Sequence, residues 1–189
     1  MRHNGFWIFA SAILLAASAL PARANLITDP GFESCANIGN ASPGWTASSR
    51  NDDCGTNSHT GNWDEDLTGA TTTLSQTITT ITGDNYDFSF WLLKSAGSPD
   101  FLTASFGSDE VLDLVNPANF GYTLEDFTVT ATGTSTTITF ASHSTDGLWA
   151  LDDVSVTDQG SAAPEPTSLL LMGTGLLGIA WRFRRRLTH

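Results

Sequence analysis

Short runs in which apolar and polar residues alternate dominate the central part of this sequence. In the run 85–93, Tyr86, Phe88 and Phe90 fall on one side of an extended chain, while Ser89 and Trp91 fall on the other. Alternation with a period of two is typical of a β-strand that buries one face. Turns rich in Gly, Asp, Asn and Pro separate this run from six others, at 70–78, 101–106, 110–114, 122–132, 136–142 and 148–157. The pattern predicts an all-β fold, an antiparallel β-sandwich over residues 25–157.

The composition of residues 25–162 supports strands and sets the charge. This part contains 23 Thr and 16 Ser, and β-branched Thr favours strands. Its fixed cations are Arg50 and Lys94, against 19 Asp and Glu residues. A domain this acidic repels phosphate, so we expect no nucleic-acid partner.

Residues 1–24 have the three parts of a secretory signal peptide. Arg2 and His3 precede an apolar run over 6–20, and an Ala-Arg-Ala sequence ends at Ala24. We therefore expect export, with cleavage after Ala24. The alternative is an uncleaved membrane anchor, although the apolar run is shorter than the ~20 residues that a spanning helix needs.

The C-terminus shows a second pattern of three ordered parts. A Pro-Glu-Pro tripeptide is followed by an apolar run with three glycines, over 167–183, and then by clustered arginines. An apolar segment closed by arginines predicts a short transmembrane helix with its basic end in the cytoplasm. Residues 158–163 predict a flexible linker before it. The motif residues are Pro164, Glu165, Pro166, Arg182, Arg184, Arg185 and Arg186.

This tail, over 164–186, resembles the PEP-CTERM sorting domain. The resemblance implies export by a Gram-negative bacterium, transient anchoring in the inner membrane and processing by an exosortase. It also implies release to the cell surface or the extracellular matrix, and an association with exopolysaccharide and biofilm. A plain C-terminal membrane anchor is the alternative.

The central domain carries loose motifs in a recognisable order. It opens on NLITDPGFE at 25–33 and closes on LDDVSV at 151–156, with the tripeptide Pro43-Gly44-Trp45 and the segment LSQTI at 74–78 between them. This order is similar to the galactose-binding-like jelly roll of many carbohydrate-binding modules. The resemblance implies a jelly-roll fold and a carbohydrate-binding role for 25–157.

Two carboxylates are candidate metal ligands. Alternation places Asp152 with Val154 and Val156 on the core side, where an unpaired carboxylate is costly. The first and last strands of a jelly roll can lie close together, so Glu33 can approach Asp152, and hard oxygen ligands suit Ca²⁺. Related modules carry a structural calcium at the matching positions, so the resemblance implies Ca²⁺ at Glu33 and Asp152. Alternatively, Asp152 accepts backbone amides or points outward after a bulge.

Tryptophans are the candidate sugar ligands, because an indole ring matches the apolar C–H face of a pyranose. Trp91 is out of phase with the phenylalanines beside it, so we expect it to face outward. Trp45 and Trp63 lie in segments rich in turn residues. The alternative is that Trp45, Trp91 and Trp149 fill the core.

We expect a non-enzymatic protein. His59 and His143 are the only histidines outside the two ends, and the chain has neither a G-x-S-x-G nor an H-E-x-x-H motif. A glycoside hydrolase with a pair of carboxylates is the remote alternative, and turnover of a glycan would reveal it.

Two further local patterns concern cysteines and an acidic segment. Cys35 and Cys54 both lie in the exported part, where an oxidising environment favours a disulfide over two free thiols. Residues 62–69 partly match a calcium loop, but Leu67 stands where that loop requires glycine. We therefore expect 62–69 to be an acidic surface loop.

Overall fold

A computed structural model describes residues 23–34, 42–48 and 52–160 of the 189-residue chain. Residues 1–22 of the predicted signal peptide, the predicted C-terminal helix with its sorting motif, and Cys35 lie outside these residues. Within them the fold is all-β, as predicted, and no helix is long and apolar enough to span a membrane. The strands are β1 (Thr46–Ala47), β2 (Asp52–Gly55), β3 (Asp64–Thr79), β4 (Asn85–Ala96), β5 (Asp100–Phe106), β6 (Asp109–Val115), β7 (Phe120–Thr130) and β8 (Ser135–Asp158).

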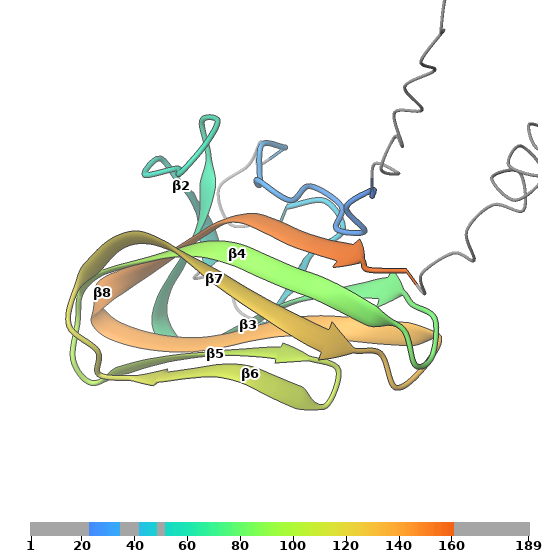
Figure 1. Ribbon diagram of the computed structural model, residues 1–189. Helices are drawn as coiled ribbons and strands as arrows, with labels where there is room; N and C mark the ends of the chain where they lie inside the picture. Colours follow the sequence, from blue (N-terminus) through green and yellow to red (C-terminus); the bar gives the residue numbers. More distant parts are fainter. Residues whose placement is uncertain (1–22, 35–41, 49–51, 161–189) are drawn as a thin grey trace, which may run out of the picture.

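The strands form one antiparallel sheet that curls into two layers, because β3 and β8 are long enough to belong to both (Figure 1). The first part of β8 pairs with β5, from Phe106↔Ile138 to Asp100↔Ser144. Its second part pairs with β4, from Ala96↔Gly147 to Tyr86↔Asp158. One layer, the β5 layer, has the order β6-β5-β8-β3-β1, and the other, the β4 layer, has the order β2-β3-β8-β4-β7.

Aromatic side chains fill the space between the layers. Phe88 and Phe90 on β4 are fully buried and lie 6.1 and 4.9 Å, between ring centroids, from Phe140 on β8. Phe106 on β5 lies 6.2 Å from Phe88. The alternation read from the sequence of β4 is thus confirmed: even-numbered residues from Tyr86 face the core, and Trp91 belongs to the opposite, outer face.

The opening segment closes one side of the sandwich by binding the last strand. The amide of Leu26 donates to the carbonyl of Val156 at 2.9 Å, and the side chain of Asn25 bonds the backbone of Val154 and Val156, both at 2.9 Å. The amide of Val154 in turn donates to the carbonyl of Pro30 at 2.8 Å. The expected approach of the first and last segments is therefore present.

Two local predictions were wrong. The runs 136–142 and 148–157 are not separate strands but parts of β8, which bends between them without a break in the strand. Residues 62–69 are not a surface loop, because β3 begins at Asp64, and both Asp64 and Glu65 are buried. Acidic residues are rare in buried strands, and the acidic side chains at the start of β3 therefore led to the prediction of a surface loop.

Candidate functional site

Carboxylates anchor the 56–63 loop, which joins β2 to β3. Glu33 accepts hydrogen bonds from the amides of Asn62 (2.7 Å) and Trp63 (3.1 Å). Asp152 on β8 accepts from the amides of His59 (2.7 Å) and Thr60 (3.0 Å). Asp64 accepts from the amide of Asn57 at 3.0 Å. The two candidate metal ligands therefore hold the same loop, at two points along it.

A bulge decides the direction of Asp152. Trp91 pairs with Asp152 and Ser89 pairs with Ser155, so β8 has one residue more than β4 between these pairs. Asp153, in the bulge, has a φ of 50°. The extra residue reverses the phase of the strand, so Asp152 shares the outer face with Trp91. Its predicted place on the core side, with Val154 and Val156, was wrong.

Asp152 is nevertheless fully buried, because the 56–63 loop covers it. Burial raises the pKa of Asp152 to about 6, while the amides of Thr60, Asp153 and His59 favour its charged form. Glu33 is more accessible, and the amides of Trp63 and Asn62 hold its pKa below the usual range. Backbone amides thus satisfy both carboxylates, as the alternative reading of Asp152 allowed.

The same loop lies over Trp91. The imidazole of His59 stacks on the indole of Trp91, with ring centroids 3.8 Å apart and 14° between the ring planes. Nδ1 of His59 lies 2.7 Å from a carboxylate oxygen of Asp153, whose other oxygen accepts from the hydroxyl of Thr60 at 2.7 Å. Trp91 is half-buried as a result, with one face of its ring covered.

Tyr122 on β7 borders this cluster. Its ring lies 5.4 Å from that of His59, and its hydroxyl donates to Asp64 at 3.2 Å. Burial and the nearby Asp64 carboxylate raise the pKa of Tyr122 well above its usual range, so the phenol remains a donor. Burial also raises the pKa of Asp64.

The three candidate sugar-binding tryptophans are in different environments. Trp45 is 6% exposed and packs against Phe32 and Phe140 in the core, so its ring offers no free face to a sugar. Trp63 is half-buried at the end of the 56–63 loop, where Glu33 binds its amide. Trp63 and Trp91 are thus the two candidates with accessible surface, and one loop links them.

The carboxylates also converge on Gly31. A Cβ atom at Gly31 would lie 3.5 Å from Oδ1 of Asp152, 3.5 Å from Oδ1 of Asp153 and 3.9 Å from Cγ of Glu33. Carboxylate oxygens are hard ligands of the kind that Ca²⁺ prefers, although the ion takes about six to eight oxygens. In the part of the chain that the structure describes, no three His, Cys, Asp or Glu side chains are grouped as a metal site. The calcium at Glu33 and Asp152 stays a prediction.

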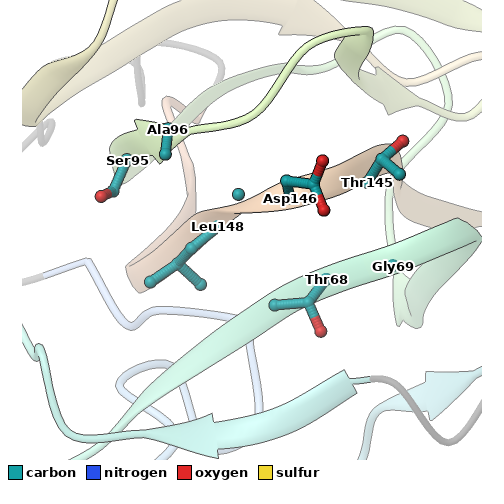
Figure 2. A pocket seen from close by; sticks show the side chains of 8 residues that line it. Thr68, Gly69, Ser95, Ala96, Thr145, Asp146 and Leu148 are labelled. Carbon is teal, nitrogen blue, oxygen red and sulfur yellow. The ribbon is translucent and has the colours of Figure 1, made fainter.

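A second feature of the β4 layer is a hollow where β8 bends, which we call the bend pocket. Thr68 and Gly69 of β3, Ser95 and Ala96 of β4, and residues 145–148 of β8 line its volume of about 540 Å³ (Figure 2). No sequence pattern predicted this pocket or the roles of His59, Asp153 and Tyr122. Gly69 and Gly147 are the local sequence features that could have indicated the bend pocket.

Two predicted features depend on residues outside the described ranges. Cys54 lies on β2, but its predicted partner Cys35 is not described, so the disulfide stays a prediction. The sorting residues from Pro164 to Arg186 are likewise known from sequence alone.

Comparison with known proteins assigns the tail directly. Residues 162–186 match the PEP-CTERM protein-sorting motif. The chain carries a PEP-CTERM sorting tail. This motif indicates an exported surface protein that is processed at the membrane. No curated protein matches the chain.

Solved structures define the fold of the domain ahead of the PEP-CTERM tail. TmCBM61, solved with β-1,4-galactotriose, has a TM-score of 0.56 at 20% identity, over 72% of this chain and 99% of that one. The CBM22-1 xylan-binding domain of Paenibacillus barcinonensis Xyn10C has a TM-score of 0.50 at 19% identity, over 76% and 100%. The enzymatically active domain of bacteriophage CBA120 tailspike protein 4 has a TM-score of 0.54 at 15% identity, over 71% of this chain and 21% of that one. The fold is therefore the jelly roll of carbohydrate-binding modules.

Proposed function

We propose that this chain is an exported, non-enzymatic carbohydrate-binding protein that its PEP-CTERM tail delivers to an exosortase, and that it then binds exopolysaccharide at the cell surface or in a biofilm matrix. The observation that carries the proposal is the combination of this tail with a jelly roll shared with carbohydrate-binding modules. The inner membrane is its transient location, and the exosortase is its processing partner.

The outer face of the β4 layer is the binding surface in this proposal. Trp91 lies on this face, and Trp63 lies at the end of the loop that crosses it. Tyr122 borders the face, and Leu124, which pairs with Trp91, is 48% exposed. The apolar C–H face of a sugar ring can pack on the aromatic and apolar side chains, and the sugar hydroxyls can bond to the polar groups beside them.

Three carboxylates beside Trp91 have structural tasks, which support a binding role over catalysis. Asp64 and Asp152 bind amides of the 56–63 loop, and Asp153 binds His59 and Thr60. A hydrolase needs one carboxyl as acid and a second one as base or nucleophile, both free to meet the substrate. The likeness to a tailspike enzyme domain concerns the fold alone.

Calcium has a structural role in this proposal. Glu33 and Asp152 would hold it together with backbone carbonyl oxygens, and the ion would supply a positive charge that no described Lys or Arg side chain brings to them. The site would fasten the opening segment and the 56–63 loop to β8, and so fix the loop over Trp91.

A binding experiment with matched variants tests the function. The mature protein is run through gels that contain the producer's own exopolysaccharide or plant β-1,4-glycans, and its retardation is measured. We expect Trp63→Ala or Trp91→Ala to weaken binding about tenfold, equivalent to about 1.4 kcal/mol. Phe101→Ala is the control, because Phe101 is a half-buried aromatic residue on the outer face of the other layer, stacked on His143.

Three results would contradict the proposal. The first is equal binding by the two tryptophan variants and the wild type. The second is a lack of retardation by every polysaccharide. The third is release of reducing sugar during incubation, which would favour the hydrolase.

A further inference from the structure

The bend pocket exists because β3 and β8 lose their register at one point. Leu67 pairs with Trp149 and Gly69 pairs with Ser144, so residues 145–148 of β8 stand opposite Thr68 alone. The two strands separate there, and the end of β4 closes the third side. The hollow has a volume of about 540 Å³ and is widely open to solvent.

Glycines shape the walls of the pocket. A side chain at Gly147 would collide with the carbonyl oxygen of Ala96, so only glycine fits this close approach of β8 to β4. Ala96 and Gly97 have φ values of 58° and 90°, which turn the chain away at the end of β4. Gly69 has a φ of 79° on the opposite wall. The pocket is therefore a built feature of three strands.

The groups around the pocket are those that bind sugars by hydrogen bonds. Ser95 brings a hydroxyl, and the half-buried Leu148 adds an apolar surface (Figure 2). Thr145 also lines the pocket, with its hydroxyl 3.3 Å from Nε2 of His143. Asp146 is exposed, and within the described residues it makes no hydrogen bond or ion pair with another side chain. A free carboxylate accepts strong, charge-assisted hydrogen bonds from hydroxyl groups.

The charge around the pocket disfavours anionic ligands. The fixed cations among the described residues are Lys94 and Arg23. Lys94 is buried in an ion pair with Asp100, at 2.8 Å. Arg23 binds the carbonyl of Gln159, whose amide pairs with Asn85 at the far end of β4. The expected cleavage after Ala24 removes this arginine from the mature protein. Lys94 also reaches the pocket wall, where its Nζ donates to the carbonyl of Ala96 at 3.2 Å, but its ion pair is with Asp100 and not with Asp146. The charge of Asp146 therefore disfavours a ligand with its own carboxylate.

The pocket continues the face that carries Trp91. Trp91, Leu93 and Ser95 alternate along the outer side of β4, and Ser95 is part of the pocket wall. From Trp91 to Ser95 the strand rises by about 13 Å. One oligosaccharide can therefore contact both places.

We propose that the bend pocket is a sugar subsite that takes an uncharged unit of the bound glycan, with Asp146 as acceptor for its hydroxyls, and that it rejects uronic acids. The proposal rests on the proposed function and adds its ligand class. It predicts selectivity for neutral over acidic polysaccharides.

The test compares the neutral oligosaccharide that binds best with its own oxidised form. Mature protein is titrated with β-1,4-linked oligosaccharides of galactose, glucose and mannose, and then with the best ligand after oxidation of its C6 hydroxymethyl groups to carboxylates. Salt is held at about 0.15 M, where charges beyond about 8 Å are screened. The variants are Asp146→Asn, Ser95→Tyr to fill the pocket, and Asp113→Asn as an exposed carboxylate on β6 of the other layer.

We expect the neutral ligand to bind the wild type about tenfold more tightly than the oxidised one. Asp146→Asn should reduce this ratio several-fold, Ser95→Tyr should weaken the neutral ligand, and Asp113→Asn should change neither. If the pocket variants keep the wild-type affinity and ratio while Trp91→Ala loses affinity, the subsite is wrong and the proposed function stands. If no oligosaccharide binds, and the tryptophan variants match the wild type on every polysaccharide, both are wrong.

Discussion

The imidazole of His59 and the indole of Trp91 lie in nearly parallel planes, with ring centroids 3.8 Å apart. One residue belongs to the 56–63 loop and the other to β4, so this stack fastens the loop to the outer face of the sheet. Because His59 also contacts Asp153 at 2.7 Å, the ring is held from two sides.

Removal of this stack should expose Trp91. We expect His59→Ala to lower the free energy of unfolding by about 1 kcal/mol, the usual size of an aromatic pair, and to increase quenching of tryptophan fluorescence by acrylamide. His143→Ala is the control, since His143 stacks on Phe101 instead, at 6.0 Å. Equal quenching of the two variants would contradict the assigned role of His59.

Asp152 should give a pH-dependent contribution to stability in calcium-free buffer. Its folded pKa of about 6 lies above the value of about 3.9 for an unfolded Asp, so the folded state binds the proton more tightly. Its contribution is therefore fully present below about pH 4 and is lost as the pH rises through about 6. Urea unfolding between pH 4 and 7 gives the free energy of unfolding of the wild type and of Asp152→Asn. The difference between the two proteins isolates Asp152, because the contributions of the other titrating groups cancel. Parallel pH profiles would show that Asp152 titrates normally.

Calcium should raise the melting temperature, and EDTA should lower it again. The ion would bring a positive charge to Glu33 and Asp152, which now rely on backbone amides. Glu33→Gln should abolish the response to calcium, while Asp113→Asn, far from both, should keep it. A melting curve that calcium and EDTA leave unchanged would contradict the calcium site.

The buried ion pair of Lys94 and Asp100 should be a large local determinant of stability. The side chains are 2% and 0% exposed, and Nζ of Lys94 also donates to Asn119 and to the carbonyl of Ala96, both at 3.2 Å. Lys94→Met should cost about 3–5 kcal/mol, because it leaves Asp100 buried and unpaired. The double variant Lys94→Met, Asp100→Leu should recover most of this loss in urea unfolding. A loss below 1 kcal/mol in the single variant would contradict the buried state of the pair.

The alternation in β4 made the strand, its buried face and the outward direction of Trp91 predictable from sequence. The same reasoning failed at Asp152, because a single bulge residue, Asp153, reverses the faces of β8 and leaves no trace in the polarity pattern. It failed for Trp45 too: a segment rich in turn residues can still bury a large ring, as its contacts with Phe32 and Phe140 show.

The candidate site was predictable as a set of residues but not as an arrangement. Glu33, Trp63, Trp91 and Asp152 were chosen for separate reasons, and the 56–63 loop brings them together through backbone amides and His59. The hydrogen bonds of Asp152 join residues more than ninety positions apart, and no local sequence pattern predicts such bonds. The bend pocket likewise depends on a register shift between distant segments.

NMR of the indole N–H groups tests most directly whether the sugar binds at Trp63 and Trp91. The signals of the mature protein are followed during titration with its best-binding oligosaccharide. We expect the signals of Trp63 and Trp91 to shift and those of the buried Trp45 and Trp149 to stay constant. Saturable binding that leaves Trp63 and Trp91 unchanged would place the ligand elsewhere and contradict this expectation.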